Sequence, residues 1–361
     1  MLTRRQVLAM AAAVPALNVM KPRVARAEAR SPWPAAAPAD APSKMGGTPS
    51  AFGLRMRAAG GRQSFDIIEH CRSLGLAGVQ TNPPSTDPAE LKKFRQRIEA
   101  NGMHLVCDPR LPKQESEVAA FEAQVTAYKE AGASVFHAAL TGRRYEDFDA
   151  LEPFKQMFEQ SKRMVALAEP VLKKHRMKLA IENHKGWRAA EQAAWMKRLG
   201  SEWVGVCLDF GNNLSLCEDP METARTLAPY VFYAHIKDMA VEDYEDGFLL
   251  SEVPMGDGFL DLKQIVALLR QKDPNMIFNL EMITRDPLKI PVYTPKYWAT
   301  FDDAYSPLPG RDLAAVLALV KKNRPKKPLP RVTGLSTEAA VKLEDDHNRQ
   351  CIAHARANLG L

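Results

Sequence analysis

Short apolar runs alternate with longer amphipathic stretches along most of this sequence. Eight of the runs have the length of buried strands, and the stretches between them repeat apolar residues at helical spacing. Strands that alternate with helices pair in parallel through right-handed crossovers. Eight such units predict an α/β fold, a closed (β/α)8 TIM barrel. The expected strands are Phe52–Met56, Gly78–Asn82, Met103–Cys107, Val135–Leu140, Lys178–His184, Val204–Leu208, Val231–His235 and Ile277–Met282.

The expected barrel is a single domain over residues 50–323, flanked by segments of different composition. Residues 28–49 are rich in Ala and Pro, which is typical of a linker. Residues 324–361 predict a charged C-terminal helical extension, suited to outer packing or to a homo-oligomer contact. Residues 239–258 predict a long acidic loop, which in a barrel would lie over the active site. An open doubly wound sheet is the alternative fold, but no glycine-rich fingerprint follows the first strand.

The N-terminus has the pattern of an export signal over residues 1–27. Arg4 and Arg5 precede an apolar run, and Ala25-Arg26-Ala27 offers a small-residue cleavage site. The arginine pair is similar to a twin-arginine (Tat) signal, with an ordinary Sec signal as the alternative. We therefore expect a periplasmic protein, or one exported elsewhere through the Tat pathway.

The charge and composition of the chain bear on which kinds of partner it could bind. The whole chain has a formal net charge of +6, but residues 1–27 contain five basic residues and no acidic one, so the remainder carries +1. A near-neutral chain does not indicate a nucleic-acid partner. Apolar residues make up 46%, which suffices for an ordinary globular core. No stretch after the N-terminus is apolar over the roughly 18–20 residues of a membrane span.

Four polar residues stand at the ends of the last four expected strands, namely Glu182, Asp209, His235 and Glu281. Parallel strands of one barrel direct their C-terminal ends to the same face, so these side chains should converge. Three carboxylates and one imidazole are costly to bury unless a cation binds them. Oxygen-rich ligation with a single His favours one divalent metal ion, Mn²⁺ before Mg²⁺ or Co²⁺, with Zn²⁺ as a further alternative.

The motifs around these positions resemble those of the sugar phosphate isomerase/epimerase family. These xylose isomerase-like barrels also include ketose 3-epimerases and DNA-repair enzymes of the endonuclease IV type. The resemblance covers about residues 50–323, and it implies that Glu182 and Glu281 act as acid and base as well as metal ligands. The motifs are Ile-Glu-Asn-His at 181–184, Cys-Leu-Asp-Phe-Gly-Asn at 207–212, His-Ile-Lys-Asp at 235–238, Gly-Asp-Gly-Phe-Leu-Asp at 256–261 and Leu-Glu at 280–281.

The sequence departs from the ketose 3-epimerase pattern around the substrate. Those enzymes have a His three residues after the metal Asp, where this chain has Asn212. They have a Glu six residues after the first metal Glu and an Arg six residues after the metal His, where this chain has Arg188 and Val241. The metal site therefore resembles that of the family, while the groups expected around the sugar differ.

Five residues near the expected metal ligands are candidates for binding a small sugar or glycoside. His184 and Lys237 lie two residues beyond Glu182 and His235, where strand alternation would place them on the same face. His184 is alternatively a partner of the metal ligands, and Lys237 a partner of Asp238 or of the acidic loop. His137 ends the fourth expected strand and is alternatively a core histidine. Arg188 and Asn212 complete the set, with a solvated role as the alternative for Arg188.

These features predict an enzyme that moves a proton next to a carbonyl. The expected activity is isomerisation or epimerisation of an unphosphorylated sugar or keto-sugar through a metal-bound enediolate. Elimination from the same enediolate would instead make the protein a lyase that cleaves keto-glycosides. A non-catalytic sugar-binding barrel and a DNA-repair nuclease are alternatives of another class, and four costly ligands argue against the first of them.

Overall fold

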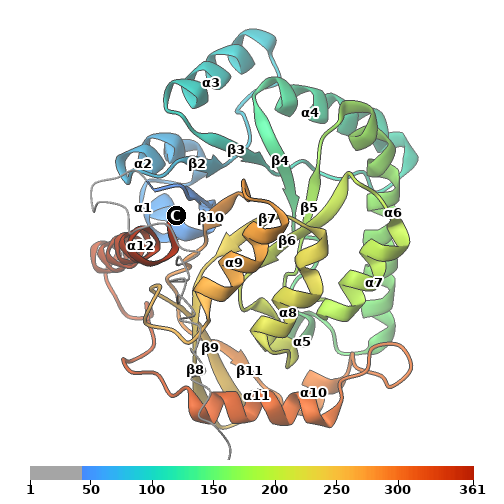
Figure 1. Ribbon diagram of the computed structural model, residues 1–361, viewed down its shortest axis with the longest axis vertical. Helices are drawn as coiled ribbons and strands as arrows, with labels where there is room; N and C mark the ends of the chain where they lie inside the picture. The colour runs from blue at the N-terminus through green and yellow to red at the C-terminus, as the bar shows by residue number, and fades with distance from the viewer. Residues whose placement is uncertain (1–42) are drawn as a thin grey trace, which may run out of the picture. The chain divides into compact units, whose positions relative to one another are not determined.

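The computed structural model describes residues 43–361, in which eight parallel strands close into a barrel ringed by helices (Figure 1). The expected α/β barrel is therefore confirmed. The predicted signal peptide and residues 28–42 of the predicted linker lie outside the described residues. Around the barrel the strand order is β1-β10-β7-β6-β5-β4-β3-β2. The strands are β1 (Gly46–Gly47), β2 (Gly78–Gln80), β3 (His104–Cys107), β4 (Ala133–Ala138), β5 (Leu179–Glu182), β6 (Val204–Asp209), β7 (Val231–Ile236) and β10 (Phe278–Leu280).

Seven of these strands overlap the predicted ranges, but the first strand does not. The expected strand Phe52–Met56 is helical, because Thr48 caps the 3₁₀ turn η1 (Pro49–Phe52) and α1 (Gly53–Ala58) follows directly. The true first strand is the pair Gly46–Gly47, which lies in the segment predicted to be linker. A Cβ on Gly46 would lie 2.2 Å from Asn279 Oδ1, so only glycine fits this close approach of β1 to β10.

Within residues 43–361, eight helices surround the strands, and the last of them comes from the predicted C-terminal extension. The helix α12 packs against α9, η1 and α1, so it completes the ring beside the first strand. The barrel thus runs from Gly46 into α12, beyond both predicted bounds of 50 and 323. No helix within residues 43–361 has the length and apolar content to cross a membrane. The ring consists of α2 (Ile67–Ser73), α3 (Pro88–Ala100), α4 (Val118–Glu130), α6 (Leu151–His175), α7 (Ala189–Leu199), α8 (Pro220–Leu227), α9 (Leu262–Lys272) and α12 (Thr337–Leu359).

The segment predicted as an acidic loop after the seventh strand is a β-hairpin. Its strands β8 (Asp238–Tyr244) and β9 (Gly247–Val253) pair antiparallel, and β11 (Leu288–Ile290) adds a third strand (Figure 1). The strand β9 is buried throughout, because it lies between two neighbours. Acidic residues gather in the second half of β8, where the strand is partly exposed. The acidic residues that suggested a loop therefore lie mainly at the exposed C-terminal end of β8.

The Gly-Asp-Gly motif that follows the hairpin is held by one buried carboxylate. Asp238 accepts hydrogen bonds from the backbone N–H groups of Met239, Gly256, Gly258 and Leu260, at 2.9–3.2 Å. A Cβ on Gly258 would lie 2.2 Å from Asp238 Oδ1. The motif thus fixes the chain path between the hairpin and α9, which explains its residue pattern structurally.

We expect Asp238→Ala to lower the free energy of unfolding by about 2–4 kcal/mol, because it leaves several buried backbone N–H groups without an acceptor. Urea unfolding followed by circular dichroism measures the loss. The matched control is Asp261→Ala, which removes an exposed cap that accepts from Gln264 N at the start of α9. This control variant should lower the free energy of unfolding by about 1 kcal/mol. Equal losses in the two variants would contradict the role given to Asp238.

Candidate functional site

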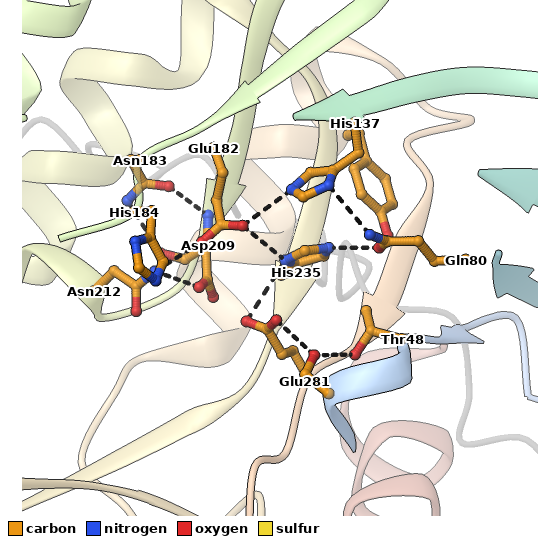
Figure 2. Close-up of polar contacts among 12 residues, drawn as sticks. Thr48, Gln80, His137, Glu182, Asn183, His184, Asp209, Asn212, His235 and Glu281 are labelled. Carbon is orange, nitrogen blue, oxygen red and sulfur yellow. Dashed lines mark hydrogen bonds and ion pairs between the residues drawn. The ribbon is translucent and has the colours of Figure 1, made fainter. Parts of the chain in front are cut away.

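Four side chains meet at the C-terminal end of the barrel. Glu182 ends β5, Asp209 ends β6, His235 lies one residue before the end of β7, and Glu281 follows β10. All four are buried, and one potential ligand atom from each lies within 4.8 Å of the others. Figure 2 shows Glu182, His235 and Glu281 pointing toward one another. The structure therefore brings together the four residues that the strand ends predict.

Hydrogen bonds fix the orientation of the His235 ring. Gln80 Nε2 donates to Asp108 Oδ1 at 2.8 Å, which orients the Gln80 amide. Gln80 Oε1 then accepts from the hydroxyl of Tyr233 at 2.8 Å and from His235 Nε2 at 2.9 Å. Because Nε2 faces Gln80, Nδ1 is the ring nitrogen that faces the cluster. Nδ1 faces carboxylate oxygens of Glu281 at 3.5 Å and Glu182 at 3.8 Å.

The charges of the cluster are not balanced by its own residues. Lys237 Nζ lies 2.7 Å from Asp209 Oδ2 and 3.1 Å from Glu281 Oε2, so one lysine directly contacts two of the three carboxylates. Burial lowers the pKa of Lys237. The negative charges of Asp209, Glu281 and a further buried carboxylate, Glu252, outweigh this effect, so the pKa of Lys237 is raised. Burial and the charge of Glu281 raise the pKa of Asp209 well above its usual range, as expected when carboxylates share too few cations.

The donor set fits a divalent cation. Asp209 Oδ1 and His235 Nδ1 are buried and have no hydrogen-bond partner within the described residues. Two unsatisfied ligand atoms of different elements in one cluster are what a bound ion would use. A second group, His137, Cys207 and His235, also brings ligand atoms within 4.8 Å. Burial raises the pKa of the Cys207 thiol to about 12, so the carboxylate set is the better cation site.

Glu182 is kept ionised by its neighbours. Burial alone would raise its pKa, but the hydrogen bond with His137 and the charges of His184 and His235 lower the pKa of Glu182 to about 2. His137 Nε2 lies 3.0 Å from Glu182 Oε2, and its Nδ1 lies 2.7 Å from Asp108 Oδ1. Burial lowers the pKa of His137, but these two carboxylates and Cys207 raise it well above its usual value. A protonated His137 therefore links Glu182 to the partly exposed Asp108.

Glu281 is positioned from the opposite side of the cluster. Its Oε1 accepts from the Ser50 hydroxyl at 2.8 Å, and Ser50 in turn contacts the Thr48 hydroxyl at 2.8 Å. Burial raises the pKa of Glu281, but the charges of Lys237 and His235 lower it well below the ordinary value. Both glutamates are thus ionised in the cluster, and both can accept a proton.

A pocket of about 630 Å³ opens over this cluster. Its floor includes Glu182, His235, Glu281, Gln80 and His137. None of its lining residues comes from the hairpin β8–β9, so the prediction that this segment covers the site is wrong for this structure. The size is ordinary for a small-molecule site.

Only one of the five predicted sugar-binding residues, His137, lines this pocket. Lys237 and Asn212 are fully buried beneath it. Asn212 donates to Asp209 Oδ2 and Glu182 Oε1 and accepts from Lys237. Asn212 and Lys237 therefore fix the side chains of the acidic cluster, which consists of Glu182, Asp209, His235 and Glu281. Strand alternation placed Lys237 on the same face as His235, and there it contacts the carboxylates of the cluster, while contact with a sugar stays a prediction.

The other two predicted sugar-binding residues are engaged elsewhere. His184 Nδ1 lies 2.7 Å from the carbonyl oxygen of Thr141, and β5 ends before it, at Glu182. Arg188 is 12% exposed and pairs with Asp312 at 2.7 Å, while its backbone begins α7. The prediction that these residues contact the sugar is therefore not supported by their positions.

Gln80, Asp108 and Ser50 were not among the predicted site residues. Gln80 ends β2 and Asp108 follows β3, so the strand-end argument applied to the earlier strands would have found both. Ser50 had no such signal, because the first strand was placed too late in the chain. These three residues orient His235, His137 and Glu281 respectively.

Comparison with known proteins gives the same fold. The chain is 25% identical over 225 residues to 3-oxo-isoapionate decarboxylase of Pectobacterium atrosepticum, which covers 62% of this chain and 74% of that protein. A crystal structure of D-psicose 3-epimerase in the presence of D-fructose matches with TM-score 0.52 and 19% identity, over 81% of this chain and 93% of that one. A xylose isomerase-like TIM barrel protein from Mycobacterium smegmatis in complex with magnesium matches with TM-score 0.51 and 15% identity, over 77% and 98%.

The family model for xylose isomerase-like TIM barrels matches residues 68–300, which is more than half of the chain. This range contains β2 to β10 and all four residues of the acidic cluster. With its closed parallel barrel and its acidic cluster at the C-terminal strand ends, this chain belongs to the family of xylose isomerase-like TIM barrels.

Proposed function

We propose that this protein is a metal-dependent sugar isomerase or epimerase acting on an unphosphorylated sugar or keto-sugar. The observation that carries the proposal is the pair of ionised glutamates, Glu182 and Glu281, on one pocket floor beside two unsatisfied ligand atoms. Glu182, Asp209, His235 and Glu281 would hold one divalent ion, Mn²⁺ before Mg²⁺, Co²⁺ or Zn²⁺. When bound, the ion would supply Lewis acidity that makes the C–H next to a carbonyl easier to deprotonate.

The two glutamates would divide the proton transfers between them. They are attached to β5 and to the end of β10, and β6 and β7 separate these strands in the barrel. One carboxylate can thus remove the proton while the other returns a proton from another side, which gives epimerisation. Return to the neighbouring carbon gives isomerisation. The Glu182–His137–Asp108 contacts, at 3.0 and 2.7 Å, offer a path by which Glu182 exchanges its proton with solvent.

A lyase reaction is the second candidate. After the same deprotonation, the electron pair can expel a β-substituent with its bonding electrons, which would cleave a keto-glycoside. The relative named 3-oxo-isoapionate decarboxylase supports this candidate, because decarboxylation is also a lyase reaction of a keto acid. A non-catalytic sugar-binding barrel and a DNA-repair nuclease remain alternatives of another class. The two buried general-base candidates argue against the first, and the near-neutral charge beyond residue 27 argues against the second.

Metal content gives the direct test of this proposal. We expect purified protein to bind about one divalent ion per chain and Asp209→Ala to lose it, since the variant removes an unsatisfied buried ligand oxygen. Elemental analysis after dialysis measures the ion, and circular dichroism checks that the barrel still folds. Asp219→Ala removes an exposed carboxylate that caps α8 and should keep the ion. Full metal retention in Asp209→Ala would contradict the proposed site.

We also propose that the protein is exported through the Tat pathway. In the variant Arg4→Lys/Arg5→Lys the precursor should remain in the cytoplasm, because recognition by this pathway depends on the arginine pair. Cell fractionation with immunoblotting measures the distribution. Unchanged export would leave the Sec pathway as the route. Sugar phosphates are scarce outside the cytoplasm, so export favours an unphosphorylated substrate.

A further inference from the structure

The pocket over the acidic cluster has two ends of opposite charge. Its floor carries Glu182 and Glu281, and its mouth is lined by four cationic side chains. Arg57 belongs to α1 and Arg62 to the 3₁₀ turn η2 (Arg62–Ser64), while Arg110 and Lys113 belong to the loop after β3. Two separate βα connections of the barrel therefore bring positive charge to the same opening.

These four cations have no ion pair at contact distance. All four are exposed, and none forms a side-chain ion pair or hydrogen bond with another residue of the range 43–361. Burial raises the pKa of Glu344 to about 7, and the charge of Arg57 opposes that rise without direct contact. Arg55, on the same short helix as Arg57, does contact a carboxylate, that of Asp345. The pocket is therefore lined by four cations that are free to contact a ligand.

The wall between the two ends is largely apolar. Met56, Leu111, Leu140 and Met164 line the pocket together with the cations. Like charges gathered over an apolar wall repel one another, and a bound anion relieves this repulsion. A negative group held by these cations would leave the uncharged, hydroxyl-bearing part of the ligand on the side of Glu182 and Glu281.

We propose that the substrate of this site is an anionic sugar, whose carboxylate or phosphate is held by Arg57, Arg62, Arg110 and Lys113. This inference rests on the proposed function and adds the substrate class to it. A carboxylate and a phosphate offer the same oxyanion chemistry to guanidinium and ammonium groups. The proposed export favours the carboxylate, as in a uronic or keto-aldonic acid.

Three sugars of one carbon skeleton test the proposal, namely D-fructose, D-fructuronate and D-fructose 6-phosphate. Their affinities for the Mn²⁺-loaded protein are measured by isothermal titration calorimetry at low and high salt. At low salt at least one anionic sugar should bind roughly 10–100-fold more tightly than D-fructose, as expected for new hydrogen bonds to a charged group. The preference should shrink at about 1 M salt, where the Debye length is about 3 Å. The tighter of the two anionic sugars identifies the anion.

Substitutions at the pocket mouth test which side chains cause the preference for anionic sugars. Arg110→Gln/Lys113→Gln should abolish most of the preference, because the affinity for the anionic sugars should fall far more than the affinity for D-fructose. Arg57→Gln/Arg62→Gln is a second, independent pair from the other connection. The matched control Lys92→Gln/Lys197→Gln removes the same charge from exposed positions on α3 and α7 and should keep the preference. Equal affinities of the wild-type protein for all three sugars, or an equal loss in the control, would overturn the anion site.

Two other outcomes are distinguishable. If a DNA duplex binds with the same dependence on Arg110 and Lys113, the mouth serves nucleic acid and the inference is wrong. Failure of the proposed function appears separately, as the absence of solvent-deuterium exchange into any of the three sugars, whatever their charge. An anion preference without exchange would retain the binding site and reject the catalytic assignment.

Discussion

Glu182→Gln and Glu281→Gln should each slow proton transfer by roughly 10²–10⁴-fold, the usual cost of losing a general base. A glutamine keeps the size of the side chain and one oxygen ligand, so metal binding should weaken only modestly. The two residues differ in their surroundings: His137 and Asn212 contact Glu182, whereas Ser50 and Lys237 contact Glu281. The variants should therefore block different steps of one reaction.

Proton NMR in D₂O separates these steps. If the reaction is epimerisation, each variant should still exchange protons on one face, so that the two variants label opposite epimers without net conversion. If the reaction is elimination, one variant should lose exchange altogether, and the other should exchange but fail to expel the leaving group. Near-normal turnover in both variants would contradict an acid–base role for either glutamate. Metal content measured on the same samples distinguishes lost chemistry from a lost ion.

Lys237→Met should lower the free energy of unfolding by about 3–5 kcal/mol, the usual cost of removing one partner from a buried ion pair. Lys237 is 0% exposed and contacts Asp209 and Glu281, so the variant leaves two buried carboxylates without their shared cation. Methionine fills most of the same volume, which limits the packing loss. Urea unfolding in the presence of EDTA measures the effect.

Saturating Mn²⁺ should recover part of this loss, because a divalent ion can take over the charge of the lysine. The matched control is Lys92→Met on the exposed surface of α3, which should change the stability by less than about 0.5 kcal/mol. A loss in Lys237→Met no larger than in this control would mean that the lysine does not balance the cluster. A loss unaffected by Mn²⁺ would separate the role of Lys237 from the proposed metal.

The core of the site could be predicted because it depends on only one structural rule. Parallel strands of a barrel end on one face, so polar residues such as Asp209 and His235, each after an apolar run, had to meet there. The contacts that orient these residues could not be predicted in the same way. Which atom of Gln80 accepts from His235, for example, depends on a third residue, Asp108, whose distance from both is set by tertiary structure.

The features that were missed depend on how the chain is arranged in space, which local residue patterns do not show. A strand of two glycines, Gly46–Gly47, has no apolar pattern, because its role is to let neighbouring backbones approach closely. Strand alternation placed Lys237 on the side of the cluster but could not show that the residue would be fully buried. Cations at the pocket mouth, such as Arg110, look like any solvated arginine in sequence. Only the arrangement of the loops shows that they line the same opening as the glutamates.

The helix α12 has a consequence for how this barrel folds during synthesis. Strand β1 pairs with β10, and Thr48 reaches Leu280 across 232 positions of the chain. Glu344 and Asn348 of α12 then accept from and donate to the backbone of residues 51–55. Contacts of such long sequence separation form late and slowly. The nascent chain therefore cannot close its barrel until β10 has left the ribosome, and until then β1 keeps one unpaired edge. The contacts of α12 with residues 51–55 can form only after residues beyond 337 have emerged.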